Sequence, residues 1–417
     1  MAERLATRKV SRTRKGLLLA VAALLALGAA LLSFGPTVDR DKRPTAQDIA
    51  LARGLIDQVK AAQAAGEPVD LDLDNRELRA LSALATDAAG HRKVAADVSD
   101  GVFTARASLP LFAGLWFNAS ATIAGTHEGF PEFRLKLGHV PLPASLSRRS
   151  ADLARWWLAR QGVELPDLDQ TVRRFEVGAS TVSARLALPR RTGLVGNMVS
   201  AAGAPVDAKL VARIYCGLAA AKAEPPAELT ALVRRAFREA SETEPAEYNR
   251  AAFVALALYV VGERADPLAP GAGAERARCP GPATPVLLRE RADLAQHWAF
   301  SAALTAVLGE ETASNLGEWK ELHDSLPAGS GFSFVDLAAD RSGVHVARRA
   351  VAPETARAAA LSLQRVSERD LLPETLVRAP EGLSEVDFSR RFGGIEAERY
   401  RRAVAWIDRQ LAAASSR

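Results

Sequence analysis

The pattern of apolar and polar positions divides the chain into regions with different periods. Residues 16–34, GLLLAVAALLALGAALLSF, carry no charged side chain over nineteen positions. An apolar run of that length can cross a bilayer as a helix, so we predict a transmembrane anchor from Gly16 to Phe34. Basic side chains in residues 1–15 hold that flank in the cytoplasm as a short tail. The bulk of the chain is therefore expected in the periplasm.

The alternative to an anchor is a cleaved signal peptide. Gly28 and Ala30 offer the small side chains of a cleavage site. The apolar run continues beyond them to Phe34, which favours an uncleaved, single-pass anchor in the inner membrane. Residues 35–68 are predicted to form a helical linker that ends at Gly66, because apolar side chains recur there at helical spacing.

From Gly101 the period changes to two, which is typical of half-buried strands. Apolar and polar side chains alternate in GVFTARASL from Phe103 to Leu109. The same alternation occurs in three further segments, 115–124, 132–138 and 180–188. We therefore predict that residues 69–190 form an α+β domain, an antiparallel sheet packed on helices.

One face of this sheet is expected to be apolar, and two arrangements would accommodate it. A helix predicted from about Ser145 to Gln161 carries Trp156 and Trp157. The apolar face is either covered by this helix or left open as a groove wide enough for a lipid. We favour the covered sheet.

Residues 191–417 have a helical period to the end and are predicted to form an all-α domain. Ala251–Val261, AAFVALALYVV, is apolar on every side but too short to span a membrane, so it is expected to be a buried core helix. Residues 264–287 are rich in Pro, Gly and Ala and are expected to form an ordered loop or a crossover. The predicted fold class is α+β, with the anchor, the sheet domain and the helical domain in that order.

The charge of the chain excludes one class of partner. Residues 1–15 carry six basic side chains and one acidic one, which accounts for the whole formal net charge of +5. The remainder is formally neutral and has no basic stripe interleaved with aromatic residues. We therefore expect no nucleic-acid partner.

Two cysteines, Cys216 and Cys279, fit an oxidising compartment. If they are paired, they close a loop of about sixty residues, which the chain-entropy model values at about 4 kcal/mol. The alternative is a pair of buried thiols, and the sequence leaves this choice open.

Acidic and imidazole side chains occur in pairs at helical spacing between residues 291 and 343. Residues three or four apart share one face of a helix, so each pair can point to a common centre. The candidates for metal ligation are Asp293, His297, Glu321, Asp324, Asp336 and Asp340. Of these, His297, Glu321, Asp324 and Asp340 are also the candidates for catalysis with a divalent metal as cofactor.

Basic residues in the same segments support a different interpretation. Arg291, Lys320 and Arg341 alternate with the acids, as they do in a buried salt-bridge network that fixes helix register without chemistry. We favour the network, with the metal or catalytic site as the alternative.

The spacing of these residues resembles a known envelope module. The pattern has His and Ser-Ala on one helix, then G-x-x-K-E-x-x-D-S, a GSG-x-S turn and D-L-A-x-D-x-x-G. It is matched by His297, Ser301, Ala302, Gly317, Lys320, Glu321, Asp324, Ser325, Gly329, Ser330, Gly331, Ser333, Asp336, Leu337, Ala338, Asp340 and Gly343. Residues 288–345 thus resemble the VanZ-like group, most closely its YfiM-type envelope lipoproteins. The resemblance implies an envelope setting in a longer, membrane-anchored proteobacterial protein, and it implies no reaction.

Two functions are consistent with these features. The first is a membrane-anchored periplasmic protein that binds or scaffolds an envelope lipid, glycan or protein partner. We favour it, and lean away from an enzyme, because no nucleophile motif such as GxSxG occurs in the chain. The alternative is a metal-assisted hydrolase or transferase that acts on an envelope phospho-compound through the His297, Glu321, Asp324, Asp336 and Asp340 side chains.

Overall fold

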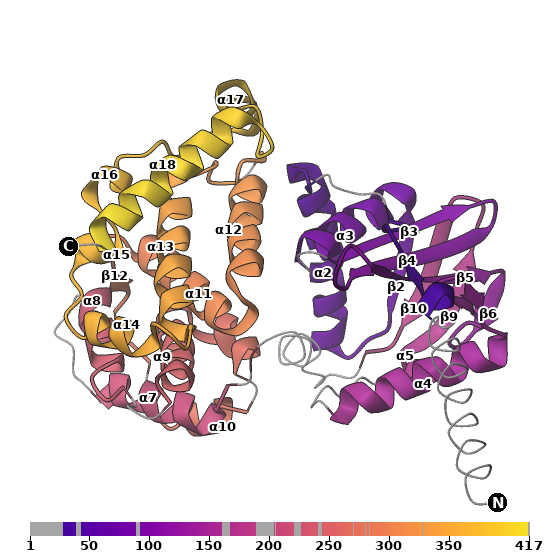
Figure 1. The fold of residues 1–417 in the computed structure, drawn as a ribbon, viewed down its shortest axis with the longest axis horizontal. Helices are drawn as coiled ribbons and strands as arrows, with labels where there is room; N and C mark the ends of the chain where they lie inside the picture. The colour runs from indigo at the N-terminus through magenta and orange to yellow at the C-terminus, as the bar shows by residue number, and fades with distance from the viewer. Residues whose placement is uncertain are drawn as a thin grey trace, which may run out of the picture. The chain divides into compact units, whose positions relative to one another are not determined.

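The computed structural model divides the chain into two compact units (Figure 1). The first, the sheet unit, contains residues up to 42, 59–153 and 167–188, and the second, the helical unit, contains residues 43–58, 154–166 and 189–417. The structure describes residues 28–38, 43–88, 92–160, 167–188, 204, 206–220, 227–240, 244–269, 271–279, 281–282, 284–327 and 329–415. It is a mixed α+β fold, with antiparallel strands followed by a helical C-terminal region.

The sheet unit contains two antiparallel sheets. The larger has the order β3-β4-β5-β7-β8, with β1 on the free part of the β5 edge. Its strands are β1 (Leu32–Ser33), β3 (Lys93–Ser99), β4 (Val102–Pro110), β5 (Trp116–Ala124), β7 (Arg134–Leu137) and β8 (Val140–Pro141). The smaller has the order β2-β10-β9-β6, formed by β2 (Val69–Asp74), β10 (Thr181–Leu186), β9 (Val172–Val177) and β6 (Thr126–Glu128). The segments that alternate with period two are thus strands, as predicted.

The core of this unit lies where the two sheets meet the helix α3 (Asn75–Ala88). Leu78 of α3, Val98 of β3 and Val182 of β10 are buried together, with Phe103 and Phe175 packed around them. A second helix, α4 (Ala144–Arg160), has the bounds expected of the tryptophan helix. Trp156 of this helix is half exposed and lies against Arg160. At the start of the same helix, Oγ of Ser147 accepts a hydrogen bond at 3.0 Å from the backbone N–H of Leu135 in β7.

The N-terminal apolar run meets the large sheet at its end. Residues 28–31 are helical, but Leu32 and Ser33 pair with Phe117 and Trp116, so a helix continuing to Phe34 is wrong at its last residues. Since β7 covers only residues 119–122 of β5, the backbone groups beyond remain open to this pairing. Residues 16–27 lie outside the described residues. Among the residues described, no helix is long and apolar enough to span a membrane.

The helical unit is built around α9 (Pro245–Val261), which is buried over most of its length, as expected for its uniformly apolar sequence. Beside it lie α11 (Ala292–Leu308) and α13 (Phe334–Val351) (Figure 1). Further helices surround these: α7 (Ala208–Ala220), α8 (Leu229–Ala236), α12 (Glu310–Asp324), α14 (Ala356–Leu363), α15 (Glu368–Leu371), α16 (Glu374–Val377), α17 (Glu385–Phe392) and α18 (Glu398–Ser415). The helix α2 (Ala46–Ala65) ends before Gly66, as predicted, and its first part belongs to this unit.

The Pro- and Gly-rich segment 264–287 is more ordered than an open loop. It includes most of the 3-10 helix η1 (Gly262–Leu268), the short α10 (Gly273–Arg276) and β12 (Val286–Leu287), which pairs in parallel with β11 (Ala227–Glu228). Cys279 of this segment forms a disulfide with Cys216 of α7, with 5.3 Å between the two Cα atoms. The alternative of two buried thiols is therefore wrong.

Candidate functional site

Three helices bring the predicted pairs together, and two glycines let them approach. A Cβ atom on Gly343 of α13 would lie 2.3 Å from the carbonyl oxygen of Trp298 on α11. A Cβ atom on Gly317 of α12 would lie 2.8 Å from Oδ2 of Asp340 on α13. A side chain at position 343 would therefore push α13 away from the α11 backbone, and one at position 317 would meet the Asp340 carboxylate.

Asp340 and His297 form the deepest contact between these helices. The Asp340 carboxylate lies 3.0 Å from Nδ1 of His297 and accepts a hydrogen bond from Oγ of Ser301 at 2.6 Å. On the other side of the imidazole, Nε2 lies 3.6 Å from Oδ2 of Asp336. Burial lowers the pKa of His297, but Asp340 opposes this and raises the pKa to about 9. The imidazole is therefore a cation at neutral pH.

Lys320 supplies the second cation. Its Nζ lies 2.8 Å from Glu321, 2.8 Å from Asp324 and 3.8 Å from Asp336. Burial lowers the pKa of Lys320, and the attraction of Glu321 and Asp324 raises it by more, so the ammonium stays charged. For Asp324, burial raises the pKa but the bond from Lys320 outweighs it, and the net pKa is lowered.

Glu321 holds two helices together. It is fully buried, and its Oε2 accepts a hydrogen bond at 2.8 Å from the backbone N–H of Ser333, the N-cap of α13. Burial raises the pKa of Glu321 to about 7, although Lys320 lowers it. Both carboxylate oxygens thus have partners within the protein, which is the arrangement of a structural network.

The candidate Asp293 lies away from this centre. It forms a two-point ion pair with Arg291, at 2.6 and 3.2 Å, and burial, which raises its pKa, is outweighed by this arginine. Arg291 also binds Glu381 at 2.8 Å, a partner that sequence spacing did not indicate. Arg341, expected among the bases of the cluster, instead pairs with Asp408 of α18 at 2.6 and 2.7 Å.

The remaining candidates, with Lys320, form an inner cluster of His297, Lys320, Glu321, Asp324, Asp336 and Asp340. Four carboxylates face two cations in it. In the described part of the chain, Oδ2 of Asp340 is buried without a hydrogen-bond partner. Of the six predicted metal ligands, only His297, Glu321 and Asp340 bring ligand atoms within 4.8 Å of one another. The inner cluster therefore has four carboxyl groups and two basic side chains, and Arg291 at its edge adds a third, 3.5 Å from Oδ1 of Asp336.

All members of the inner cluster except Glu321 line a cavity of about 660 Å³, and we call them its acidic floor. Four apolar residues also line it and are called the apolar wall: Val261, Phe300, Leu304 and Leu316. The rim carries Arg264, Gln296 and Arg291, with Arg264 donating to Gln296 at 3.1 Å. The cavity thus joins an acidic floor, an apolar wall and a rim on which Arg291 is paired with Asp293 and Glu381, and its size is that of a small-molecule site.

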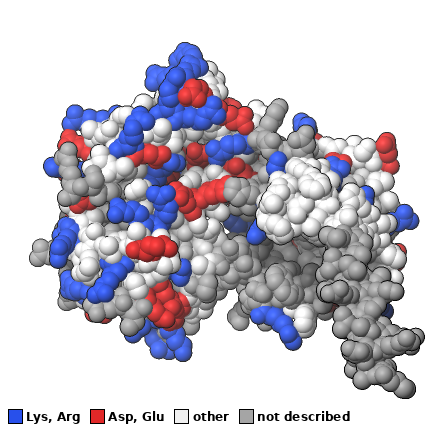
Figure 2. Space-filling model, in the orientation of Figure 1, with Lys and Arg blue, Asp and Glu red and all other residues white. Residues whose placement is uncertain are grey.

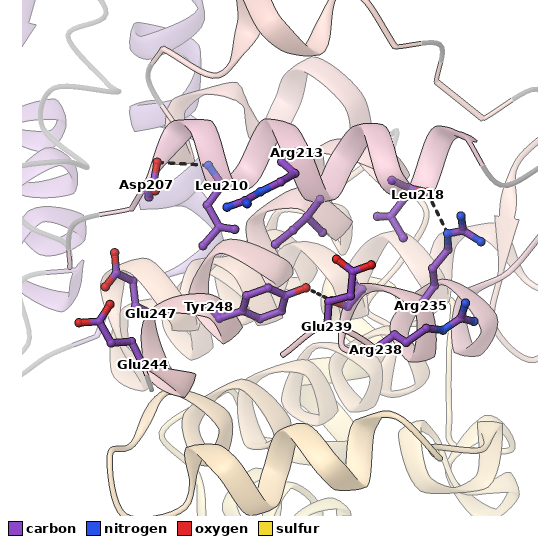
Figure 3. Close-up of a pocket in the computed structure, with 13 residues that line it drawn as sticks. Asp207, Leu210, Arg213, Leu218, Arg235, Arg238, Glu239, Glu244, Glu247 and Tyr248 are labelled. Atoms are coloured by element: carbon purple, nitrogen blue, oxygen red, sulfur yellow. Dashed lines mark hydrogen bonds between the residues drawn. The ribbon is translucent and has the colours of Figure 1, made fainter. Parts of the chain in front are cut away.

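A second cavity, of about 510 Å³, lies between α7, the end of α8 and the start of α9. Figure 3 shows Asp207, Glu244 and Glu247 toward one end of it and Arg235 and Arg238 toward the other. Sequence reasoning identified no candidate here, since these charges are spread over three helices without a common spacing. Acidic and basic side chains are interspersed over the face of the helical unit shown in Figure 2.

Comparisons with protein-family models, with curated proteins and with solved structures give no match. The likeness of residues 288–345 to the VanZ-like module therefore stays a prediction that rests on the residues themselves.

Proposed function

We propose that this chain is a periplasmic envelope protein, anchored by the apolar run that begins at Gly16 and ends before Leu32, whose helical unit binds a phospholipid with an amine headgroup. The observation that carries the proposal is the cavity, whose lining combines apolar and acidic side chains. An ammonium group fits a floor where carboxylates outnumber cations, and a phosphate fits the rim beside Arg264. An acyl chain fits the wall of Phe300, Leu304 and Leu316, which favours a lipid over a glycan.

The proposal is tested by titrating the full chain with short-chain phosphatidylethanolamine and phosphatidylglycerol. We expect the amine lipid to bind more tightly, and Asp336→Asn to weaken it about tenfold by removing one floor charge. Asp169→Asn is the matched control, because Asp169 lies in the sheet unit in an exposed ion pair with Arg148. Equal affinity for the two lipids, or equal loss in both variants, would contradict the proposal.

A second function, metal-assisted hydrolysis or transfer on an envelope phospho-compound, is favoured by one observation. Ligand atoms of His297, Glu321 and Asp340 converge within 4.8 Å, and Oδ2 of Asp340 has no partner among the described residues. Imidazole and carboxylate ligands suit zinc or manganese, and such an ion would activate water for hydrolysis. Lys320 and the Ser333 N–H already occupy the Glu321 carboxylate, so we place this function second.

Elemental analysis of the purified full chain separates the two functions. A metal site predicts a stoichiometric ion that Asp340→Asn removes and Asp293→Asn retains, since Asp293 lies outside the converging group. Absence of a bound ion after dialysis against zinc and manganese would rule out this second function.

A further inference from the structure

Exposed apolar side chains gather at one end of the large sheet. Phe34 is 91% exposed and Phe112 is 72% exposed, with the half-exposed Leu111 next to it. A single exposed apolar residue is ordinary on a protein surface, whereas neighbouring ones mark an interaction surface. We call these three residues the apolar tip.

Strand register places the three residues together. Pro110 of β4 and Ser33 of β1 both pair with Trp116, from opposite sides of β5. Leu111 and Phe34 are the next residues along their strands, so they flank the same end of β5, about 10 Å apart at the usual strand spacing. The apolar tip is therefore one patch, although its members come from segments far apart in the sequence.

The loop that carries Phe112 is a fixed turn. The N–H of Leu111 donates to the carbonyl of Leu115 at 2.8 Å, and the N–H of Leu115 donates back to Phe112 at 3.0 Å. Ala113 adopts a φ of 51°, which is rare for a residue with a side chain. A turn that holds a strained residue to keep a phenylalanine in solvent is consistent with a binding role.

The N-terminal apolar run enters the sheet at this same end. The N–H of His139 donates to the carbonyl of Ala30 at 2.8 Å, and a Cβ atom on Gly138 would lie 2.5 Å from the carbonyl oxygen of Leu31. Beyond the strand, the N–H of Thr37 donates to Ser108 at 3.1 Å. The described end of the apolar run, from Ala30 to Ser33, is thus fixed to the part of the sheet that carries the apolar tip.

We infer that the apolar tip inserts into the interfacial layer of the bilayer that holds the anchor. The inference rests on the proposed anchor, because its helix ends before Leu32, and Phe34 follows β1 directly and lies beside Leu111 at the same end of β5. Lys93 at the same end, 5.8 Å above the Trp116 ring, adds a positive charge suited to anionic headgroups. The sheet unit would then be held against the membrane at two points.

Single-cysteine labelling of the full chain in vesicles tests the inference. Both native cysteines are in the disulfide, so Phe112→Cys and Asp100→Cys each provide one reactive thiol for an environment-sensitive dye. Asp100 is the matched control, because it lies in the turn before β4, at the opposite end of that nine-residue strand and about 30 Å away. We expect nitroxide-bearing lipids to quench the dye at position 112 several-fold more than at position 100.

Flotation of the labelled protein with the vesicles distinguishes insertion of the apolar tip from membrane anchoring. Protein that floats, yet shows equal quenching at both positions, would overturn insertion of the apolar tip and leave the anchor in place. Protein that does not float would overturn the anchor and the insertion together.

Discussion

Gly317 leaves the space that the Asp340 carboxylate occupies: a Cβ atom at Gly317 would lie 2.8 Å from Oδ2 of Asp340. The same oxygen is buried without a hydrogen-bond partner among the described residues. A helix glycine thus leaves room for the Asp340 carboxylate beside α12. The relationship makes the site sensitive to a single methyl group.

We predict that Gly317→Ala destabilises the helical unit by about 1–3 kcal/mol, the usual effect of overpacking. The control is Gly217→Ala on α7, where an added Cβ meets nothing within 4 Å. That variant should be stabilised by roughly 0.5–1 kcal/mol, because alanine restricts the unfolded chain. Denaturant titration measures both, and equal midpoints for the two variants would contradict the tight contact at Gly317.

The pKa shifts in the inner cluster predict that the free energy of unfolding decreases as the pH rises from about 5 to 9. Asp340 raises the pKa of His297 to about 9 against the lowering effect of burial, and burial raises the pKa of Glu321 to about 7. In both cases the folded state binds the proton more tightly than the unfolded state. The contribution of His297 to the free energy of unfolding is complete below pH 6.5 and is lost as the pH approaches 9. The contribution of Glu321 is complete below pH 4.5 and is lost as the pH approaches 7, because the buried side chain then has to lose its proton.

Thermal unfolding with a chelator present measures this dependence. His297→Gln should unfold at a lower temperature than the parent at pH 6 and at nearly the same temperature at pH 9. A difference that is constant over this range would show that the imidazolium contributes nothing.

The disulfide should contribute about 4 kcal/mol to the stability of the helical unit in the chain-entropy model, because it joins residues 63 positions apart. The double variant Cys216→Ser and Cys279→Ser removes it without leaving a free thiol. We expect a lower denaturant midpoint that dithiothreitol no longer changes, whereas the parent loses stability on reduction. A parent protein insensitive to reduction would contradict the expected contribution.

Local periodicity accounts for what the sequence predicted well. Alternation in GVFTARASL has a single structural interpretation, and β4 follows it from Val102 to Pro110. The uniformly apolar segment Ala251–Val261 is correspondingly buried within α9. Helical spacing also identified His297, Glu321 and Asp340, which meet because their three helices pack closely at glycines.

Ion pairs with partners from distant segments account for the contacts that the sequence did not predict. Asp293 is at helical spacing from His297, but the guanidinium of Arg291 binds its carboxylate at the rim. Arg341 finds its partner, Asp408, sixty-seven residues later on α18. Neither choice is encoded in local spacing, because several acids compete for each arginine and the fold decides between them.

Native mass spectrometry of the full chain, released from membranes in mild detergent, tests the central claim most directly. We predict an adduct with the mass of an amine phospholipid, which Leu304→Trp removes by filling the apolar wall of the cavity while the chain stays folded. An adduct retained in that variant, an adduct of phosphatidylglycerol alone, or a folded chain without any lipid would contradict the account.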